Sequence, residues 1–301
     1  MGKLKNIFQK NKGQSNAPVN KTTEAPKNVK AMERKNERRR FSLLVEDAVE
    51  VQRLQGIMVL GTIHGKIKEG DTVYVYQSSK PPMELKVLAL ETGPRVTAEI
   101  AKNQKVGVCL NVEDKELISR YSVLSSVSPR EVLAGGKAAV ENPRLLGLTM
   151  EYQRLHETPE YFNLLLYELC YARFAAPFYM DQPPIPSSDG TVRFAPGAKV
   201  GIPSLKKSGD ETKSVFPVFT DLGAMWNWKD AFHEDQPRQT VVLRLPEVIS
   251  FASQGHDGIV INAFGPVPVY LPLDLLEQVA QTEMFKKLFE KKEAPKKEDL
   301  N

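Results

Sequence analysis

The chain has 301 residues, 41% of them hydrophobic and 26% charged, a composition typical of a globular protein with room for two domains. Its net charge of +4 is uneven, because residues 1–40 contain twelve Lys or Arg and three Glu, which leaves −5 for the other residues. An acidic body argues against a nucleic-acid-binding surface spread over the whole fold.

Both cysteines lie in apolar runs, Cys109 in VGVCL and Cys170 in YELCYARF. We interpret them as buried reduced thiols, with a disulfide as the alternative, and this usage is typical of a cytoplasmic protein. Apolar runs stay well short of the ~20 residues of a membrane-spanning helix, and the basic N-terminus lacks the apolar core of a signal peptide. The sequence therefore predicts a cytoplasmic location.

Residues 1–38 are expected to form a disordered basic tail. After Phe8 they contain few large apolar residues and many Lys, Asn, Thr and Pro, so burial cannot offset the entropy of ordering them. One interpretation is attachment to RNA or to an anionic membrane surface, and the other is a solvated tail without a partner.

Residues 39–128 are expected to form an all-β barrel, because short strand patterns follow one another closely with Gly, Pro, Asn and Asp between them. The candidate strands are 40–48, 56–63, 71–77, 83–90, 98–101, 105–110 and 121–125. In GIMVLGTIHGKIKEGD (56–71) we expect the first strand to end in a turn around Gly65, with His64 exposed at the hairpin tip.

Four segments of this unit follow a known pattern: FSLLVEDAVEV, QGIMVLGTIHGKIKEGDTVYVY, QKVGVCL and SRYSVL. The pattern resembles domain 2 of the translational GTPases, the elongation factor Tu family. The matching residues are Phe41, Glu46, Asp47, Gly56, Gly61, Ile63, Gly65, Ile67, Gly70, Asp71, Val106, Gly107, Leu110, Arg120, Val123 and Leu124. The sequence departs from it at Gln104 and Tyr121, where Gly is usual. The resemblance implies a barrel that docks on a partner domain, on the ribosome or on the aminoacyl end of a tRNA.

A GTPase function does not follow from this resemblance. The run from Gly61 through Gly65 and Lys66 lacks the spacing of a phosphate-binding loop and is followed by Ile67 rather than Ser or Thr. GTP hydrolysis is therefore not expected, and the barrel is interpreted as a binding module.

Residues 129–141, with Gly135-Gly136, are expected to be a linker, and residues 142–281 an α+β domain with a mixed sheet and helices. Helices are predicted to begin at Pro143 and Pro159 and to cover 221–232, 246–253 and 272–281. Strands are predicted at 176–180, 199–205, 213–219, 239–245, 258–262 and 267–271. The first of these is placed at a sheet edge because it contains Pro177.

This second unit resembles the SseB family, which is named for enhanced serine sensitivity in bacteria. The resemblance is carried by NPRLL (142–146), VFPVFTD (215–221), the Trp226/Trp228 pair, GIVINAFG (258–265) and LPLD (271–274). It covers residues 142–281, and the GIVINAFG segment is its most specific part. The resemblance implies no catalytic residues.

Five residues are candidates for a partner or ligand surface: Trp226, Trp228, Asn262, Phe264 and Gly265. Asn262, Phe264 and Gly265 form the lip of a pocket in one interpretation, whereas in the other Asn262 bonds the turn backbone and Gly265 shapes the bend. The two tryptophans lie two positions apart on a predicted helix, so one is expected in the core and the other on a partner surface. No catalytic residue, metal site or cofactor is predicted, because ligand spacings and a nucleophile elbow are missing from the sequence.

Residues 282–301 are expected to extend the last helix through Leu288 and then to form a charged tail. Its apolar stripe, Met284, Phe285, Leu288 and Phe289, is predicted to pack on the body, with membrane contact as the alternative.

Three functions remain open at this point. The first is a non-catalytic interaction or regulatory protein with a protein partner. The second is an RNA- or ribosome-associated protein that uses the barrel and the basic tail. The third is an enzyme or a binder of an amino-acid-related small molecule, with a pocket near Asn262.

Overall fold

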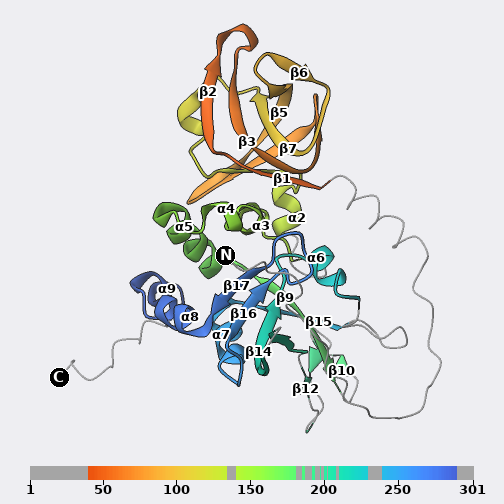
Figure 1. The fold of residues 1–301 in the computed structure, drawn as a ribbon, viewed down its shortest axis with the longest axis vertical. Coiled ribbons are helices and arrows are strands. Elements are labelled where there is room, and N and C mark those ends of the chain that lie inside the picture. Colours follow the sequence, from red (N-terminus) through yellow and green to blue (C-terminus); the bar gives the residue numbers. More distant parts are fainter. Residues whose placement is uncertain are drawn as a thin grey trace, which may run out of the picture.

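The fold consists of a β-barrel placed on a layer of helices, with a mixed sheet below that layer (Figure 1). The computed structural model describes residues 40–133, 140–180, 185–186, 192–193, 197, 200–201, 203–207, 210–229 and 239–289. The predicted tail, 1–38, and the end of the C-terminal segment, 290–301, lie outside the described residues.

The barrel is closed and antiparallel, which confirms the predicted fold of the first unit. Its strands are β1 (Phe41–Leu44), β2 (Asp47–Val51), β3 (Gly56–Lys68), β4 (Thr72–Gln77), β5 (Lys80–Gly93), β6 (Val96–Ala98), β7 (Ile100–Leu110) and β8 (Val123–Ser125). Pairing runs β1-β8-β4-β5-β7-β3 and returns to β1, while β2 adds to β3 and β6 adds to β5. Short η1 (Gln52–Leu54) and η2 (Lys115–Leu117) helices lie in the connections.

The predicted turn around Gly65 is wrong, because β3 continues through this glycine as one strand. The pairing of β3 with β7 shifts by one residue between Ile63 and Lys66, which is the mark of a β-bulge. Gly65 has φ +102°, and a Cβ there would lie 2.3 Å from the carbonyl oxygen of Arg40. Glycine is therefore required for a bulge and a close backbone approach, two uses that a sequence pattern does not separate from a turn.

The second unit has one mixed sheet covered on both faces, and it confirms the predicted α+β class. Its strands are β9 (Phe174–Met180), β12 (Val200–Gly201), β13 (Leu205–Lys207), β14 (Asp210–Val218), β15 (Gln239–Leu243), β16 (Gly258–Ile261) and β17 (Val269–Pro272), beside a small pair β10 (Ile185–Pro186) and β11 (Val192–Arg193). β14 and β16 are parallel, and a bridge between Ala175 and Phe219 joins β12-β9-β15 to β13-β14-β16-β17. Side chains of β14 alternate between two cores, with Phe216 in one and Val215 in the other.

The edge position predicted for the strand containing Pro177 is wrong. β9 pairs with β15 along one side, where Pro177 lies opposite Thr240. On its other side β9 contacts Phe219 through Ala175 and β12 through Tyr179, and Pro177 lies between these two contacts. The missing N–H of proline therefore interrupts neither pairing.

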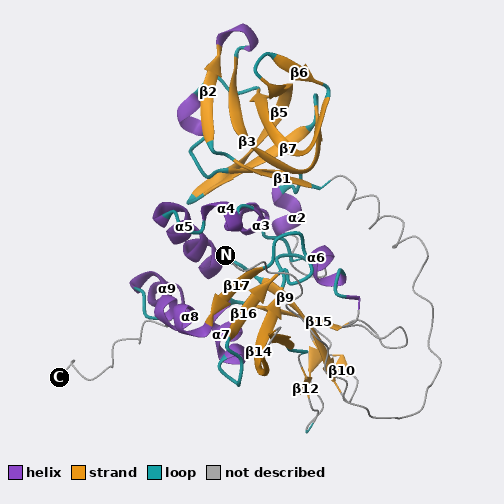
Figure 2. Cartoon of the chain, viewed as in Figure 1, coloured by secondary structure: helices purple, strands orange, loops and turns teal. Residues whose placement is uncertain are grey.

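Most helices lie between the barrel and the sheet or on the sheet face next to them (Figure 2). They are α2 (Pro129–Leu133), α3 (Pro143–Met150), α4 (Tyr152–Leu155), α5 (Pro159–Tyr171), α6 (Leu222–Trp226), α7 (Leu245–Ala252), α8 (Leu273–Ala280) and α9 (Glu283–Phe289). α6 is shorter than the predicted helix 221–232, because it ends at Trp226, and residues 230–238 of that prediction are outside the described residues. The C-terminal stripe packs on the body through Phe285, as predicted, although α9 is a separate helix.

Candidate functional site at the junction of the two units

One apolar core runs across the boundary between the barrel and the second unit. It contains Leu44, Tyr121 and Val123 of the barrel together with Leu148 of α3 and Tyr161 of α5, all at most 2% exposed. The rings of Tyr121 and Tyr161 meet edge to face with centroids 6.1 Å apart. The barrel is thus packed on the helices as parts of one domain pack on each other.

Gly147 is the point of closest approach in this core. A Cβ at Gly147 would lie 2.6 Å from both methyl carbons of Val123 and 3.0 Å from Oγ of Ser42. Helix interiors disfavour glycine, so its place in the middle of α3 is explained by the need to bring the helix against β1 and β8.

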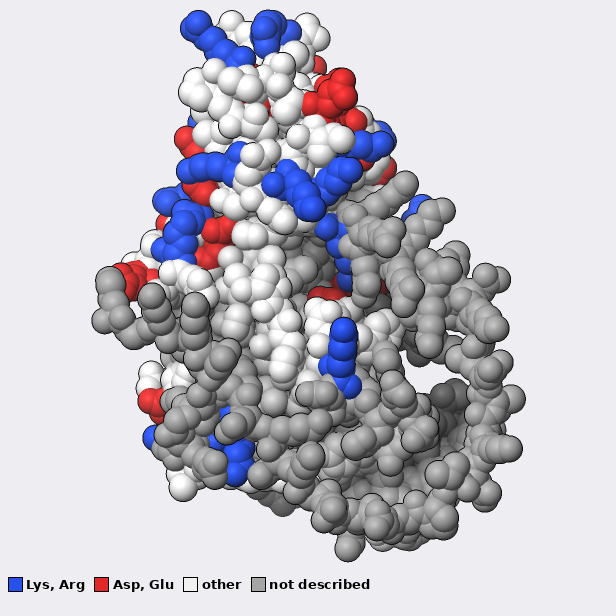
Figure 3. All heavy atoms as spheres, turned by 45° about the vertical axis from the view of Figure 1, so that its right-hand side comes forward, with Lys and Arg blue, Asp and Glu red and all other residues white. Residues whose placement is uncertain are grey.

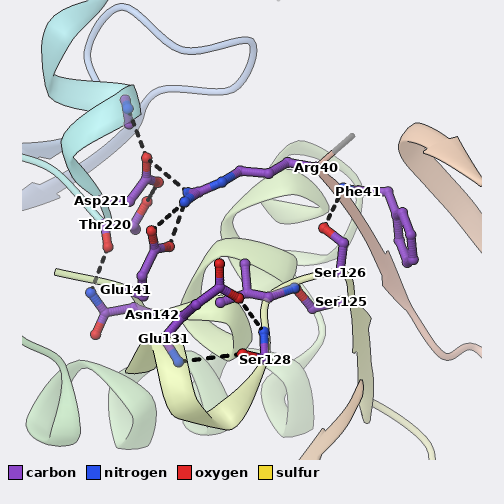
Figure 4. Close-up of polar contacts among 12 residues, drawn as sticks. Arg40, Phe41, Ser125, Ser126, Ser128, Glu131, Glu141, Asn142, Thr220 and Asp221 are labelled. Carbon is purple, nitrogen blue, oxygen red and sulfur yellow. Dashed lines mark hydrogen bonds and ion pairs between the residues drawn. The ribbon is translucent and has the colours of Figure 1, made fainter. Parts of the chain in front are cut away.

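Arg40, directly before β1, ties the barrel to the second unit (Figure 4). Its guanidinium donates two hydrogen bonds to the carboxylate of Glu141, one of 3.0 Å from Nη1, and lies 3.8 Å from Oδ1 of Asp221. Burial raises the pKa of the Glu141 carboxyl to about 7; Arg40 acts against this, whereas the nearby Asp221 and Glu131 act with it. One cation thus faces three carboxylates, which makes Glu141 sensitive to pH near neutrality.

A buried polar network continues from Asp221 to the carboxyl ends of the parallel strands β14 and β16. The backbone N–H of Thr220 donates to Oδ1 of Asn262 (3.0 Å), Nδ2 of Asn262 donates to Oγ1 of Thr220 (2.9 Å), and that hydroxyl donates to Asp221 (2.9 Å). Asn142 donates from Nδ2 to the Thr220 carbonyl (2.7 Å) and so joins the start of α3 to this network. In open α/β sheets, ligands bind outside the carboxyl ends of the parallel strands.

The structure brings the five candidate residues into one region of the fold. Trp228 stacks on Phe264 with ring centroids 5.2 Å apart, and Gly265 donates its N–H to the carbonyl of Asn262. Asn262 has φ +52°, and its side chain accepts a hydrogen bond from the backbone N–H of Thr220, 42 positions earlier in the chain, rather than from the backbone of its own turn. Trp228 is in the core, and Trp226 packs against the same cluster while staying partly exposed.

A second contact between the units contradicts the expectation for His64. Nε2 of His64 lies 2.8 Å from Oε1 of the buried Glu151, so the histidine is half-buried at the junction rather than exposed at a hairpin tip. Arg154 donates to Glu151 (2.9 Å) and to Glu46 of the barrel (3.0 Å). Although burial alone would raise the pKa of Glu151, its hydrogen bonds from His64 and Arg154 lower it.

A third contact was not predicted from the sequence. Nε of Arg144 in α3 lies 3.0 Å from Oε1 of Glu168 in α5, and the hydroxyl of Ser78 in the β4–β5 hairpin reaches the same oxygen at 3.4 Å. Burial lowers the pKa of Arg144 and raises that of Glu168. The sequence gives little indication of such ion pairs, because the two partners are far apart in the chain.

Both cysteines are free and buried, as predicted. In the part of the chain that the structure describes, His, Cys, Asp and Glu form no group of three or more suited to a metal ion. None of the helices within the described ranges is long and apolar enough to cross a membrane.

A comparison with known protein families gives a match to the second unit. Residues 149–278 match the family model of the SseB protein N-terminal domain. This unit is an SseB-like domain. The match begins at the end of α3, so it contains the sheet and Asn262, whereas α2, most of α3 and α9 lie outside it.

The chain has a weak structural match to GDP-bound aIF5B from Aeropyrum pernix. The sequence identity is 19%, the match covers 29% of this chain and 16% of that one, and the TM-score is 0.25. No curated protein matches the chain.

Proposed function

We propose that this chain is a non-catalytic binding protein of the cytoplasm, in which the SseB-like domain holds the barrel in one orientation and the outer barrel wall contacts a partner. The continuous core across the two units is the observation that carries this proposal. It supports a fixed platform, because a barrel that shares buried Leu44, Tyr121 and Val123 with the helices cannot reorient without exposing them.

The polar groups at the junction support a role in holding the two units together rather than a role in catalysis. Arg40, His64 and Ser78 of the first unit are each matched by a carboxylate of the second: Glu141, Glu151 and Glu168. Carboxylates committed to such bonds are poorly placed to bind a substrate.

The alternative of a small-molecule pocket near Asn262 has less support. The side-chain amide of Asn262 is already bonded to Thr220 through both its oxygen and its nitrogen, and the residue is 5% exposed. Ligand binding there requires breaking a buried network in which each of these groups has a partner.

Site-specific photo-crosslinking in cells tests the proposal. A photoreactive residue replaces Val96 or Ile100 on the barrel, 54% and 47% exposed, or replaces the exposed control residues Glu247 of α7 and Glu277 of α8. The proposal predicts a discrete cross-linked partner from the barrel positions that is absent at the control positions. The same cross-links from all four positions, or none from the barrel, would overturn it.

A further inference from the structure

The SseB-like sheet ends in a strand whose outer edge is open. β15 pairs with β9 along one side, and within the described ranges no strand pairs with its other side. Ala175 of β9 exchanges backbone hydrogen bonds with Phe219, so its N–H and C=O point away from β15. Val242, which lies opposite Ala175, must then direct its own N–H and C=O outward, and so must Thr240 two positions earlier. Hydrogen bonds among the described residues leave these outward groups unused.

Other edge strands of this molecule carry features that prevent edge-to-edge pairing. β17, at the opposite edge of the same sheet, ends in Pro272, and β2 of the barrel exposes Asp47 and Glu50. Proline, charged side chains and bulges are the usual protections of a sheet edge. β15 has the sequence QTVVL, with no charged residue and no proline, and its register with β9 runs without a bulge. This edge is therefore built in the way that favours pairing with another strand.

The side chains along this edge also suit an interface. Val242 is 51% exposed, although it is apolar and β-branched. Charged residues are depleted from the cores of protein interfaces, and β15 has none. The barrel wall differs, because Lys, Arg, Asp and Glu side chains lie across it (Figure 3). An uncharged strand gives a charged peptide nothing to pair with, whereas it suits a strand of its own composition.

A second copy of β15 matches this edge group for group. When two copies pair antiparallel about Val241, Thr240 of each copy lies opposite Val242 of the other. Opposed residues of this kind exchange both of their hydrogen bonds, so every outward N–H and C=O of Thr240 and Val242 finds a partner. The arrangement has twofold symmetry, which closes the assembly as a dimer. It also covers the exposed Val242 with the β-branched Thr240 of the other copy.

We propose that β15 is the contact through which two copies of this chain pair edge to edge and join their sheets into one. The inference goes beyond the proposed function and does not depend on it, because β15 lies in the sheet below the helical layer, away from the barrel (Figure 1). Pairing leaves both barrels free. A dimer with two barrels binds a partner that offers two sites more tightly than one barrel does.

Sedimentation of the full chain between about 1 and 100 μM tests the proposal. The variant Val242→Lys places a charge on the open edge, and Val49→Lys makes the same change at an exposed valine of the barrel edge strand β2. Both variants should fold, because the two side chains are exposed, and circular dichroism checks this. We expect the wild type and Val49→Lys to dimerise alike and Val242→Lys to dimerise at least about tenfold more weakly. A wild type that stays monomeric, or equal dimerisation of all three proteins, would overturn the proposal.

Disulfide trapping tests the register of the pair. In the proposed dimer the two copies of Val241 are opposed with Cα atoms about 4.5 Å apart, which lies within the range that a disulfide spans. Oxidised glutathione should therefore link Val241→Cys into a covalent dimer faster than it links Val49→Cys, although Val49 is the more exposed position. The two native cysteines are buried and do not compete. If Val241→Cys links no faster than Val49→Cys, β15 is not the contact between copies.

Discussion

Substituting Gly147 by Ala tests the close packing of the barrel on α3. The new Cβ would lie 2.6 Å from both methyl carbons of Val123, about 1 Å closer than carbon atoms normally approach. Val123 is fully buried in β8 between β1 and β4, so it cannot move aside easily. Overpacking of this kind costs about 1–3 kcal/mol, while Ala gains about 1 kcal/mol of helix propensity over Gly.

Since these two effects partly cancel in the single variant, the coupling between the sites is the informative quantity. Val123→Ala alone should cost about 2 kcal/mol through lost burial, and it removes both methyl groups that the new Cβ would strike. In the double variant Gly147→Ala/Val123→Ala the clash with Val123 disappears, whereas the 3.0 Å approach of the new Cβ to Oγ of Ser42 remains in both variants that carry Gly147→Ala. We therefore expect a favourable coupling energy of about 1–3 kcal/mol, free of the helix-propensity contribution.

Urea unfolding of the four proteins, followed by circular dichroism and by tryptophan fluorescence, measures this coupling. Wild type and both single variants must keep one slope against urea for the comparison to hold. If the two substitutions add within about 0.5 kcal/mol, α3 does not contact β8 as described, and the reasoning from Gly147 is refuted.

Three further predictions concern the polar junction. The pKa of Glu141 is raised to about 7 in the folded protein, so folding becomes less favourable as this carboxyl loses its proton. The free energy of unfolding of the wild type, relative to that of Glu141→Gln, should therefore decrease by on the order of 1–3 kcal/mol as pH rises from about 5 to 7.5. A difference in urea midpoint between the two proteins that is the same at both pH values would contradict this. Glu151 has a lowered pKa, so Glu151→Gln should cost about 1–3 kcal/mol at neutral pH and less in acid, which a pH series of thermal unfolding measures; a cost that does not shrink in acid counts against it. Asn262→Ala should cost about 2–3 kcal/mol and Asn262→Gly about 1 kcal/mol less, because glycine tolerates the φ of +52°; equal losses in chemical unfolding would argue against backbone strain.

The local pattern of the sequence was sufficient for the fold of each unit. Alternation along β14 and β16 places Phe216 and Ile259 on one face of the sheet and Val215 and Val260 on the other. Period-two patterns report this directly, because each strand is buried by its own neighbours. Asn142 and Pro143 also marked the start of α3 correctly, because Pro is favoured at the first position of a helix.

Glycine and short capping signals were less informative. Gly65 looked like a turn and occupies a bulge, since both need a positive φ. In the segment predicted as a linker, α2 begins at Pro129 behind a reciprocal pair of hydrogen bonds between Ser128 and Glu131, the Ser-x-x-Glu capping box. That signal is present in the sequence, but a helix of five residues is too short to show the helical spacing of apolar residues.

The junction itself could not be predicted. Its pairs join Arg40 to Glu141 and His64 to Glu151, about a hundred positions apart, and a single sequence does not indicate which distant charges meet. Asn262 was identified as a candidate from its place after a strand, but its partner Thr220 became apparent only from the parallel pairing of β14 and β16.

The central claim is that the barrel and the SseB-like domain form one cooperative body, and scanning calorimetry of the full chain tests it most directly. The shared core of Leu44, Tyr121, Val123 and the helices predicts one heat-absorption peak, with a calorimetric enthalpy about equal to the van't Hoff enthalpy. Two separate peaks, or a calorimetric enthalpy about twice the van't Hoff value, would show that the units unfold independently and would contradict the account.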